Sequence, residues 1–157
     1  MGYNVIDLID KAINIAIRKK DIYEGIGHRK CDIPSIEIMS KVLAKEVDKS
    51  IKYYEKLKNE VSEEKDEEIE IEFFIYDKMS FLINEFNKKS FVKEINNIIE
   101  YLKFSLDLEK DGKSLLIDLQ GRFMKNADDI NTRTYKILTD MINNKDKLIK
   151  TLEKIIK

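Results

Sequence analysis

Apolar residues in this chain recur at three- and four-residue intervals, which is the spacing of amphipathic helices rather than of strands. The first such stripe lies in residues 4–26, where Gly25 and Gly27 mark its end. A second stripe begins after a short loop in which Asp32 offers an N-terminal cap. Its members are Ile36, Leu43, Val47, Tyr54, Leu57 and Val61. The pattern therefore predicts a first helical hairpin over about residues 4–61.

A long connection separates this hairpin from the rest of the chain. Residues 62–91 begin with a run of charges and then return to helical spacing, which predicts a crossover that carries one short helix. Two further stripes predict helices over about residues 92–120 and 129–156. Their inward positions are Ile95, Ile98, Leu102, Ser105, Glu109, Gly112, Leu116 and Leu119, followed by Thr134, Leu138, Met141, Lys145, Leu148, Leu152 and Ile155.

The order of these elements defines the expected fold. A second antiparallel hairpin over about residues 92–157 follows the first, and one long crossover joins the two. That connectivity belongs to ferritin-like four-helix bundles. We therefore expect an all-α chain in which residues 1–157 form a single domain.

Four short motifs extend this expectation to a family. They are the run Ala12-Ile13-Asn14-Ile15 leading to Tyr23-Glu24, the run Leu43-Ala44-Lys45-Glu46 leading to Tyr53-Tyr54-Glu55, the segment Phe104–Asp111, and the tail Leu152-Glu153-Lys154. With these motifs the chain resembles the rubrerythrin branch of the ferritin-like superfamily over essentially its whole length. The resemblance implies a bundle interior in which relatives hold two iron ions.

The ligands that the resemblance implies are mostly missing. The family pattern is one Glu from each of two helices and a Glu-x-x-His pair from each of the other two. Carried onto this sequence, those positions are Ala16, Val47, Ser50, Glu109, Lys145 and Leu148. Glu109 alone keeps a ligand, and the single histidine of the chain, His28, falls in a loop. We therefore expect a degenerate di-iron site, with no metal and no cofactor.

Glu109 and Lys145 are expected to form an ion pair at the former metal position. A lone buried carboxylate is costly, so it must take up a proton or find a cation. Lys145 lies on the inward stripe of the neighbouring helix and offers that cation. Ala16, Val47 and Leu148 are expected to close the position with apolar bulk.

Other candidate ligands are weaker. His28-x-x-Cys31 has a spacing compatible with metal ligands, but two ligands do not make a site. Glu46 and Asp48 flank a core stripe, where charges usually face solvent. The acidic run within residues 63–72 lacks the alternating ligands and central glycine of a calcium loop, so we interpret it as a linker.

The composition limits the kinds of partner and the compartment that we expect for this chain. Charged residues make up 38% of the chain, yet the net charge is −1, so no overall field favours nucleic acid or an anionic membrane. One cysteine excludes an internal disulfide and fits a reducing compartment. No apolar run approaches the ~18 residues of a membrane span. The sequence therefore predicts a soluble cytoplasmic protein.

The functional expectation follows from the ligand loss. We expect a non-catalytic binding or structural module, and a possible homodimer that pairs through Phe73, Phe74, Ile75 and Met79 of the crossover. The alternative is a di-iron or di-manganese oxidoreductase that handles peroxide with a non-standard ligand set. A third possibility is small-molecule binding in the old metal cavity.

Overall fold

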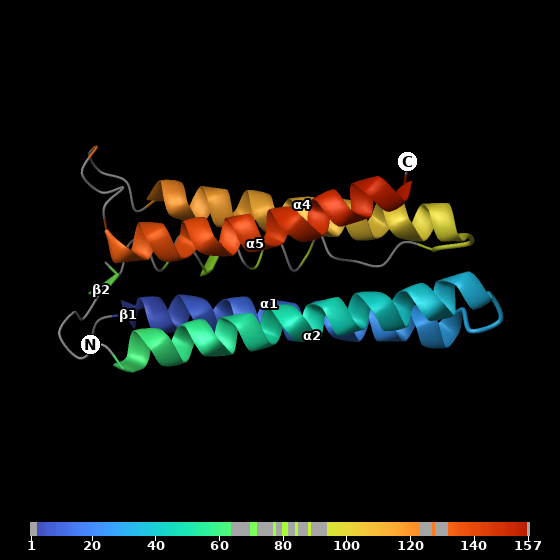
Figure 1. Ribbon diagram of the computed structural model, residues 1–157, viewed down its shortest axis with the longest axis horizontal. Helices are drawn as coiled ribbons and strands as arrows, with labels where there is room; N and C mark the ends of the chain where they lie inside the picture. Colours follow the sequence, from blue (N-terminus) through green and yellow to red (C-terminus); the bar gives the residue numbers. More distant parts are fainter. Residues whose placement is uncertain are drawn as a thin grey trace. The chain divides into compact units, whose positions relative to one another are not determined.

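The structure is a computed structural model, shown in Figure 1. It describes residues 3–63, 70–71, 94–122 and 132–156, together with the single positions 77, 80, 81, 84, 88 and 127. Within these residues the chain has four long helices: α1 (Val5–Arg29), α2 (Pro34–Glu63), α4 (Ile98–Arg122) and α5 (Arg133–Ile156). A minimal sheet pairs β1 (Tyr3–Asn4) with β2 (Glu70–Ile71), which the sequence pattern did not predict. The all-α expectation is otherwise confirmed for this part of the chain.

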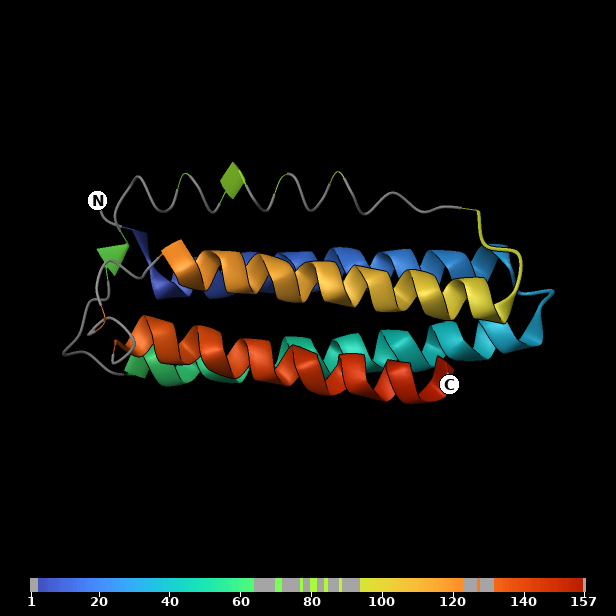
Figure 2. The same ribbon diagram turned by 90° about the horizontal axis from the view of Figure 1, so that it is seen from above.

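The helices form two hairpins, each within its own compact unit. Tyr3–Glu70 make up one unit, here called the α1–α2 unit, and Ile71–Lys157 belong to the other, the α4–α5 unit. In both views the two helices of each hairpin run antiparallel alongside each other (Figures 1 and 2). The arrangement of the two units as one four-helix bundle, in one domain, stays a prediction.

In the α1–α2 hairpin, α1 extends further than the hydrophobic pattern predicted, and it contacts α2 closely near its end. α1 continues past Gly25 and Gly27 to Arg29, so the predicted end at residue 26 was three residues short. Neither glycine has a positive φ, so neither acts as a left-handed helix terminator. Gly27 instead permits close contact with α2, because a Cβ at this position would lie 2.6 Å from the Cβ of Ser40. The core of this unit includes the fully buried Leu8, Ile9, Tyr23, Ile26 and Ile36.

The start of α2 also differs from the prediction. The carbonyl of Ile33 accepts hydrogen bonds from the N–H groups of Ile36 and Glu37, at 3.0 and 3.1 Å. Ile33 is therefore the N-cap, and Pro34 occupies the first helical position, where a missing N–H has no cost. Asp32, which was expected to be the N-cap, lies one residue before Ile33, and its side chain is exposed.

The α4–α5 hairpin begins later than the hydrophobic pattern indicated. α4 starts at Ile98 rather than Val92, and side-chain hydrogen bonds of Asn97 and Glu100 cap its N-terminus. Asn97 Oδ1 accepts from the N–H of Glu100, and Glu100 Oε2 accepts from the N–H of Asn96, each at 2.9 Å. α5 starts at Arg133 rather than Asp129, with the Thr132 hydroxyl accepting the N–H of Tyr135 at 3.3 Å.

The predicted crossover helix falls mostly outside the described residues. Asp77, Ser80, Phe81, Asn84 and Lys88 are described, and each is helical. The predicted dimer surface of Phe73, Phe74, Ile75 and Met79 lies outside the described residues.

Candidate functional site: a polar cluster in the α4–α5 hairpin

The buried face of α4 changes character in its middle. Leu102, Leu116 and Leu119 occupy the two ends of this face, and all are buried. Between them come Ser105, Glu109 and Gly112, which are also buried. These positions recur at three- and four-residue spacing, so they share one face of the helix. A small and polar patch therefore interrupts an otherwise apolar stripe.

Glu109 is the charged centre of this patch. Its side chain is 0% exposed, and its Oε2 lies 3.1 Å from Nζ of Lys145, whose side chain is 12% exposed. Both residues also take part in further interactions. The structure thus brings together the two residues that the sequence analysis paired. At this distance the ammonium donates a charge-assisted hydrogen bond to the carboxylate.

Gly112 makes room for the lysine. A Cβ at Gly112 would lie 3.2 Å from Lys145 Nζ and 3.4 Å from its Cδ. The lysine side chain therefore crosses α4 where that helix has no side chain of its own. Glu109 and Gly112 are three residues apart, so one turn of α4 supplies both the carboxylate and the space beside it.

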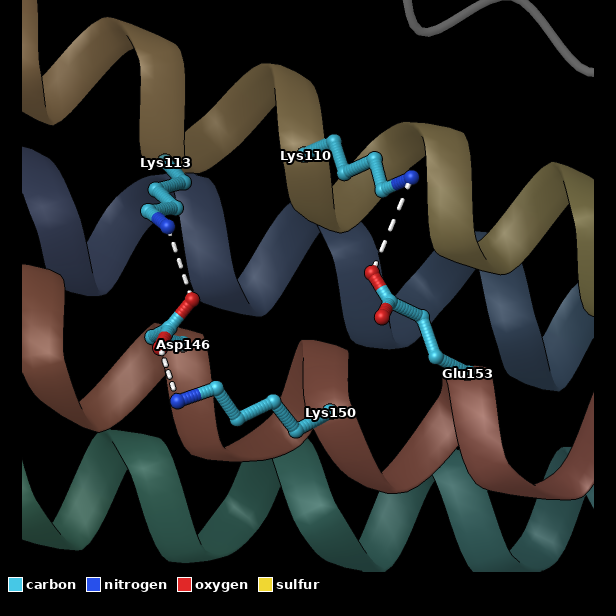
Figure 3. Close-up of polar contacts among 5 residues, drawn as sticks. All are labelled: Lys110, Lys113, Asp146, Lys150 and Glu153. Atoms are coloured by element: carbon cyan, nitrogen blue, oxygen red, sulfur yellow. Dashed lines mark hydrogen bonds and ion pairs between the residues drawn. The ribbon is translucent and has the colours of Figure 1, made fainter.

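A ladder of half-buried and exposed ion pairs runs along the same hairpin (Figure 3). Lys113 Nζ lies 2.7 Å from Asp146 Oδ1, and Lys150 Nζ lies 3.1 Å from Asp146 Oδ2. Lys110 Nζ lies 3.7 Å from Glu153 Oε1. The hydrogen bond from Lys113, followed by that from Lys150, lowers the pKa of Asp146 below its ordinary value of 3.8.

The ladder and the buried pair take their positive and negative charges from opposite helices. In the ladder α4 supplies the cations Lys110 and Lys113 and α5 supplies the anions, whereas in the buried pair α4 supplies Glu109 and α5 supplies Lys145. A helix slipped or rotated by one position would bring like charges together. The arrangement therefore favours a single alignment of α4 on α5.

Gln120 adds a third polar contact between these helices. Its Nε2 donates to the backbone carbonyl of Tyr135 at 3.1 Å and to the Thr139 hydroxyl at 2.6 Å. Sequence reasoning missed Gln120, Lys113 and Asp146. The Asp146–Lys150 spacing of four residues was a detectable helix signal, but nothing in the pattern showed which α4 residue faces them.

The other predicted site positions lie as follows. Ala16 and Val47 are buried and Ser50 is partly buried, all in the α1–α2 unit. Leu148 is partly buried on α5. The expectation that Ala16 and Val47 close the position around Glu109 spans both units and stays a prediction.

Lys20, a helix neighbour of Ala16, makes contacts within its own hairpin. Its Nζ lies 2.9 Å from Asp48 Oδ1 and 3.7 Å from Glu24 Oε1. The hydrogen bond with Asp48 is the main cause that raises the pKa of Lys20. Asp48 is thus paired with a cation of α1, in keeping with a structural rather than a metal-binding role.

His28 lies in the last turn of α1, so the expectation that it falls in a loop was wrong. With Cys31 it lines an open cleft of about 450 Å³ between α1 and α2. Gly27, Ser40 and Ala44 are among its other lining residues. No group of three or more His, Cys, Asp or Glu side chains with metal-binding geometry occurs in the described residues.

The comparisons with known proteins add no relative. No family model, no curated protein and no solved structure matches this chain. The resemblance to the rubrerythrin branch therefore stays a prediction from the motifs quoted above. Among the described residues, no helix combines the length and the apolar character required to cross a membrane.

Proposed function

We propose that this chain is a ferritin-like bundle protein of the rubrerythrin branch that has lost its di-metal chemistry and acts as a non-catalytic binding or structural module. The observation that supports it most is the contact of Lys145 with Glu109. An ammonium group lies 3.1 Å from the one carboxylate that matches the family's ligand pattern.

The charge balance at Glu109 supports a structural role. A carboxylate that ligates a divalent ion in relatives is here neutralised by a side chain of the next helix. A metal ion that used Glu109 would have to displace Lys145 and leave its ammonium group without this carboxylate. It would also find no imidazole on α4 or α5, since His28 is the only histidine of the chain. Iron and manganese sites of this class need several carboxylates and imidazoles together.

The direct experiment is elemental analysis of protein purified from cells grown with added iron and manganese. We expect both metals well below one ion per chain, in the wild type and in a Glu109→Gln variant alike. Iron or manganese near two ions per chain in the wild type, and reduced in Glu109→Gln, would favour the alternative of an oxidoreductase with an unusual ligand set.

We also propose that the module forms a homodimer through the predicted crossover surface. Light scattering coupled to size exclusion measures the mass in solution. We expect a species of twice the chain mass of 18.5 kDa. A strict monomer at high protein concentration would remove the homodimer from the proposal and leave the structural role untouched.

A further inference from the structure

The solvent-facing side of α2 separates basic residues from acidic ones. The helix holds six lysines and six acidic residues, so these charges cancel over its whole length. Five of the lysines nevertheless fall within one arc of about 100° around the helix axis, at roughly 3.6 residues per turn. No Asp or Glu between residues 38 and 56 falls in that arc. The five are all exposed and are here called the lysine stripe: Lys41, Lys45, Lys49, Lys52 and Lys56.

The positive charge of the lysine stripe is available to a partner. Nζ of Lys41 lies 3.5 Å from Glu37 Oε1, and Nζ of Lys49 lies 3.0 Å from Glu46 Oε1. Such exposed pairs within one helix are weak and are screened by salt. The other three members have no ion pair among the described residues: Lys45, Lys52 and Lys56. Because α2 runs straight in both views (Figures 1 and 2), the stripe is a linear row of charges about 23 Å long.

The exposed side of α4 shows a different distribution. There Lys103 and Lys110 alternate with three acidic residues, and all five are exposed: Lys103, Lys110, Glu100, Asp107 and Asp111. In such a mixed row each charge has opposite charges as neighbours. In the lysine stripe the neighbours at three- and four-residue spacing are like charges, which destabilise a helix. An anionic surface laid along α2 would relieve that repulsion.

Two exposed apolar side chains extend the lysine stripe at its N-terminal end. Ile38 is 63% exposed and Val42 is 45% exposed, and both fall in the same arc as the lysines. Cations and exposed apolar groups on one helix face are typical of helices that lie on a membrane surface. Anionic headgroups attract the ammonium groups, and the boundary between headgroups and acyl chains accommodates the apolar side chains.

We propose that the lysine stripe, together with Ile38 and Val42, binds the surface of an anionic phospholipid bilayer. This inference rests on the proposed function as a binding module and gives that module a partner. The net charge of −1 does not oppose the contact, because charges more than about 10 Å away are largely screened at about 0.1 M salt. The contact is peripheral, so it requires no helix that crosses the membrane.

Other anionic partners fit the lysine stripe less well. Nucleic acids are read by arginine and amide side chains at base edges and by aromatic side chains that stack on bases, and the stripe has none of these. Protein interfaces are enriched in arginine and aromatic residues and depleted in lysine. A second copy paired symmetrically through the same stripe would place lysine against lysine.

Vesicle sedimentation with the full chain tests the proposal. We expect binding to phosphatidylcholine vesicles that contain about 30% phosphatidylserine, much weaker binding to pure phosphatidylcholine, and a steep loss between about 0.1 and 0.5 M salt. Replacing three lysines of the stripe should weaken binding about 100-fold, at roughly fivefold per lysine. The variant is Lys45→Gln, Lys52→Gln and Lys56→Gln.

A control variant removes the same charge from other helices and should keep the wild-type affinity within about fivefold. Its three substitutions are at exposed positions: Lys103→Gln, Lys136→Gln and Lys147→Gln. Absence of wild-type binding to the anionic vesicles, or an equal loss in the two triple variants, would overturn the proposal. Tighter binding to duplex DNA or to polyglutamate than to these vesicles would also overturn it, because the stripe would then serve another polyanion.

Ile38→Ser separates the apolar contact from the charge. It should weaken vesicle binding several-fold and leave the salt dependence unchanged, because it removes apolar area and no charge. Ile117→Ser is the control, since Ile117 is 47% exposed on α4. An unchanged affinity in Ile38→Ser would contradict the contact with a membrane. Such a failure is distinct from a failure of the proposed loss of di-metal chemistry, which would show as metal in the purified protein.

Discussion

Gly27 shows at the scale of a single residue how a missing side chain sets the distance between two helices. It is buried in α1, and the Cβ of Ser40 on α2 occupies the space where its own Cβ would lie. Gly112 has the same role toward the side chain of Lys145. Both glycines therefore serve packing inside a helix, although glycine lowers helix stability by up to about 1 kcal/mol relative to alanine.

Replacing Gly27 by alanine tests this role. The added methyl group would lie 2.6 Å from Ser40 Cβ, so the helices must separate, and we expect a loss of about 1–3 kcal/mol in the free energy of unfolding. Gly25→Ala in the same helix is the control, since its nearest contact is the flexible end of Arg29 at 3.4 Å. That variant should be neutral or gain up to about 1 kcal/mol from helix propensity. Urea unfolding measures both, and an equal response at the two positions would show that close packing at Gly27 is not limiting.

At the scale of the helices, the hydrophobic pattern predicted which segments are helical and misplaced several of their ends. The starts of α4 and α5 are six and four residues later than predicted. Apolar periodicity continues through residues such as Ile95, which is buried yet lies outside the helix. The caps at Asn97 and Thr132 depend on individual side chains and not on periodicity, so a stripe cannot locate them.

The contacts between helices also differ in whether the sequence could predict them. Glu109 and Lys145 could be paired from the sequence because both interrupt apolar stripes, where a charge requires a partner. Lys113 and Asp146 lie beside their stripes, where charges are usually solvated, and only the rotation of α4 against α5 decides that they meet. That rotation is set by packing, which the pattern of apolar residues does not specify.

The ladder between α4 and α5 predicts a pH dependence. Asp146 has a lower pKa in the folded chain than its ordinary value of 3.8, mainly because Lys113 donates to it. Its contribution to stability is therefore fully present above the unfolded pKa and is lost as the pH falls through the folded pKa. We expect Asp146→Asn to lower the Tm at neutral pH and the difference from wild type to shrink as the pH falls below 3.8.

Thermal scans from pH 7 to pH 2 would measure this difference. Asp118→Asn is a suitable control, because Asp118 is exposed in the same hairpin and has no ion pair among the described residues. A Tm difference for Asp146→Asn that stays constant down to pH 2 would contradict this prediction. It would show that the charge of the Asp146 carboxylate does not contribute to the stability of the hairpin.

At the scale of the whole molecule, acidic and basic residues nearly cancel, with a net charge of −1, and several of them form ion pairs within a hairpin. Each hairpin has ion pairs between its own two helices, as Lys58 with Asp10 shows at 2.7 Å. These ion pairs therefore support the alignment of the two helices within each hairpin. Which partner or ligand the protein takes was not predictable from the sequence, because no cluster of chemically active residues stands out in it.

The interior acid–base pair is the feature on which the proposed function depends. If Glu109 and Lys145 form a structural pair, removing one of them leaves the other charge buried without its partner and destabilises the fold. Replacing both by apolar residues has little effect on stability. We expect Glu109→Leu and Lys145→Met each to lose about 3–5 kcal/mol in the free energy of unfolding, because each leaves the other charge buried without its partner. The exposed pair of Lys110 and Glu153, at 3.7 Å, is the matched control and should couple by less than about 1 kcal/mol.

The most direct measurement is therefore a double-mutant cycle on Glu109 and Lys145 by denaturant unfolding. The account predicts that the double variant Glu109→Leu with Lys145→Met loses far less than the two single variants added together, with a coupling of several kcal/mol. Single losses that simply add in the double variant would contradict it, because the two charges would then stabilise the chain independently.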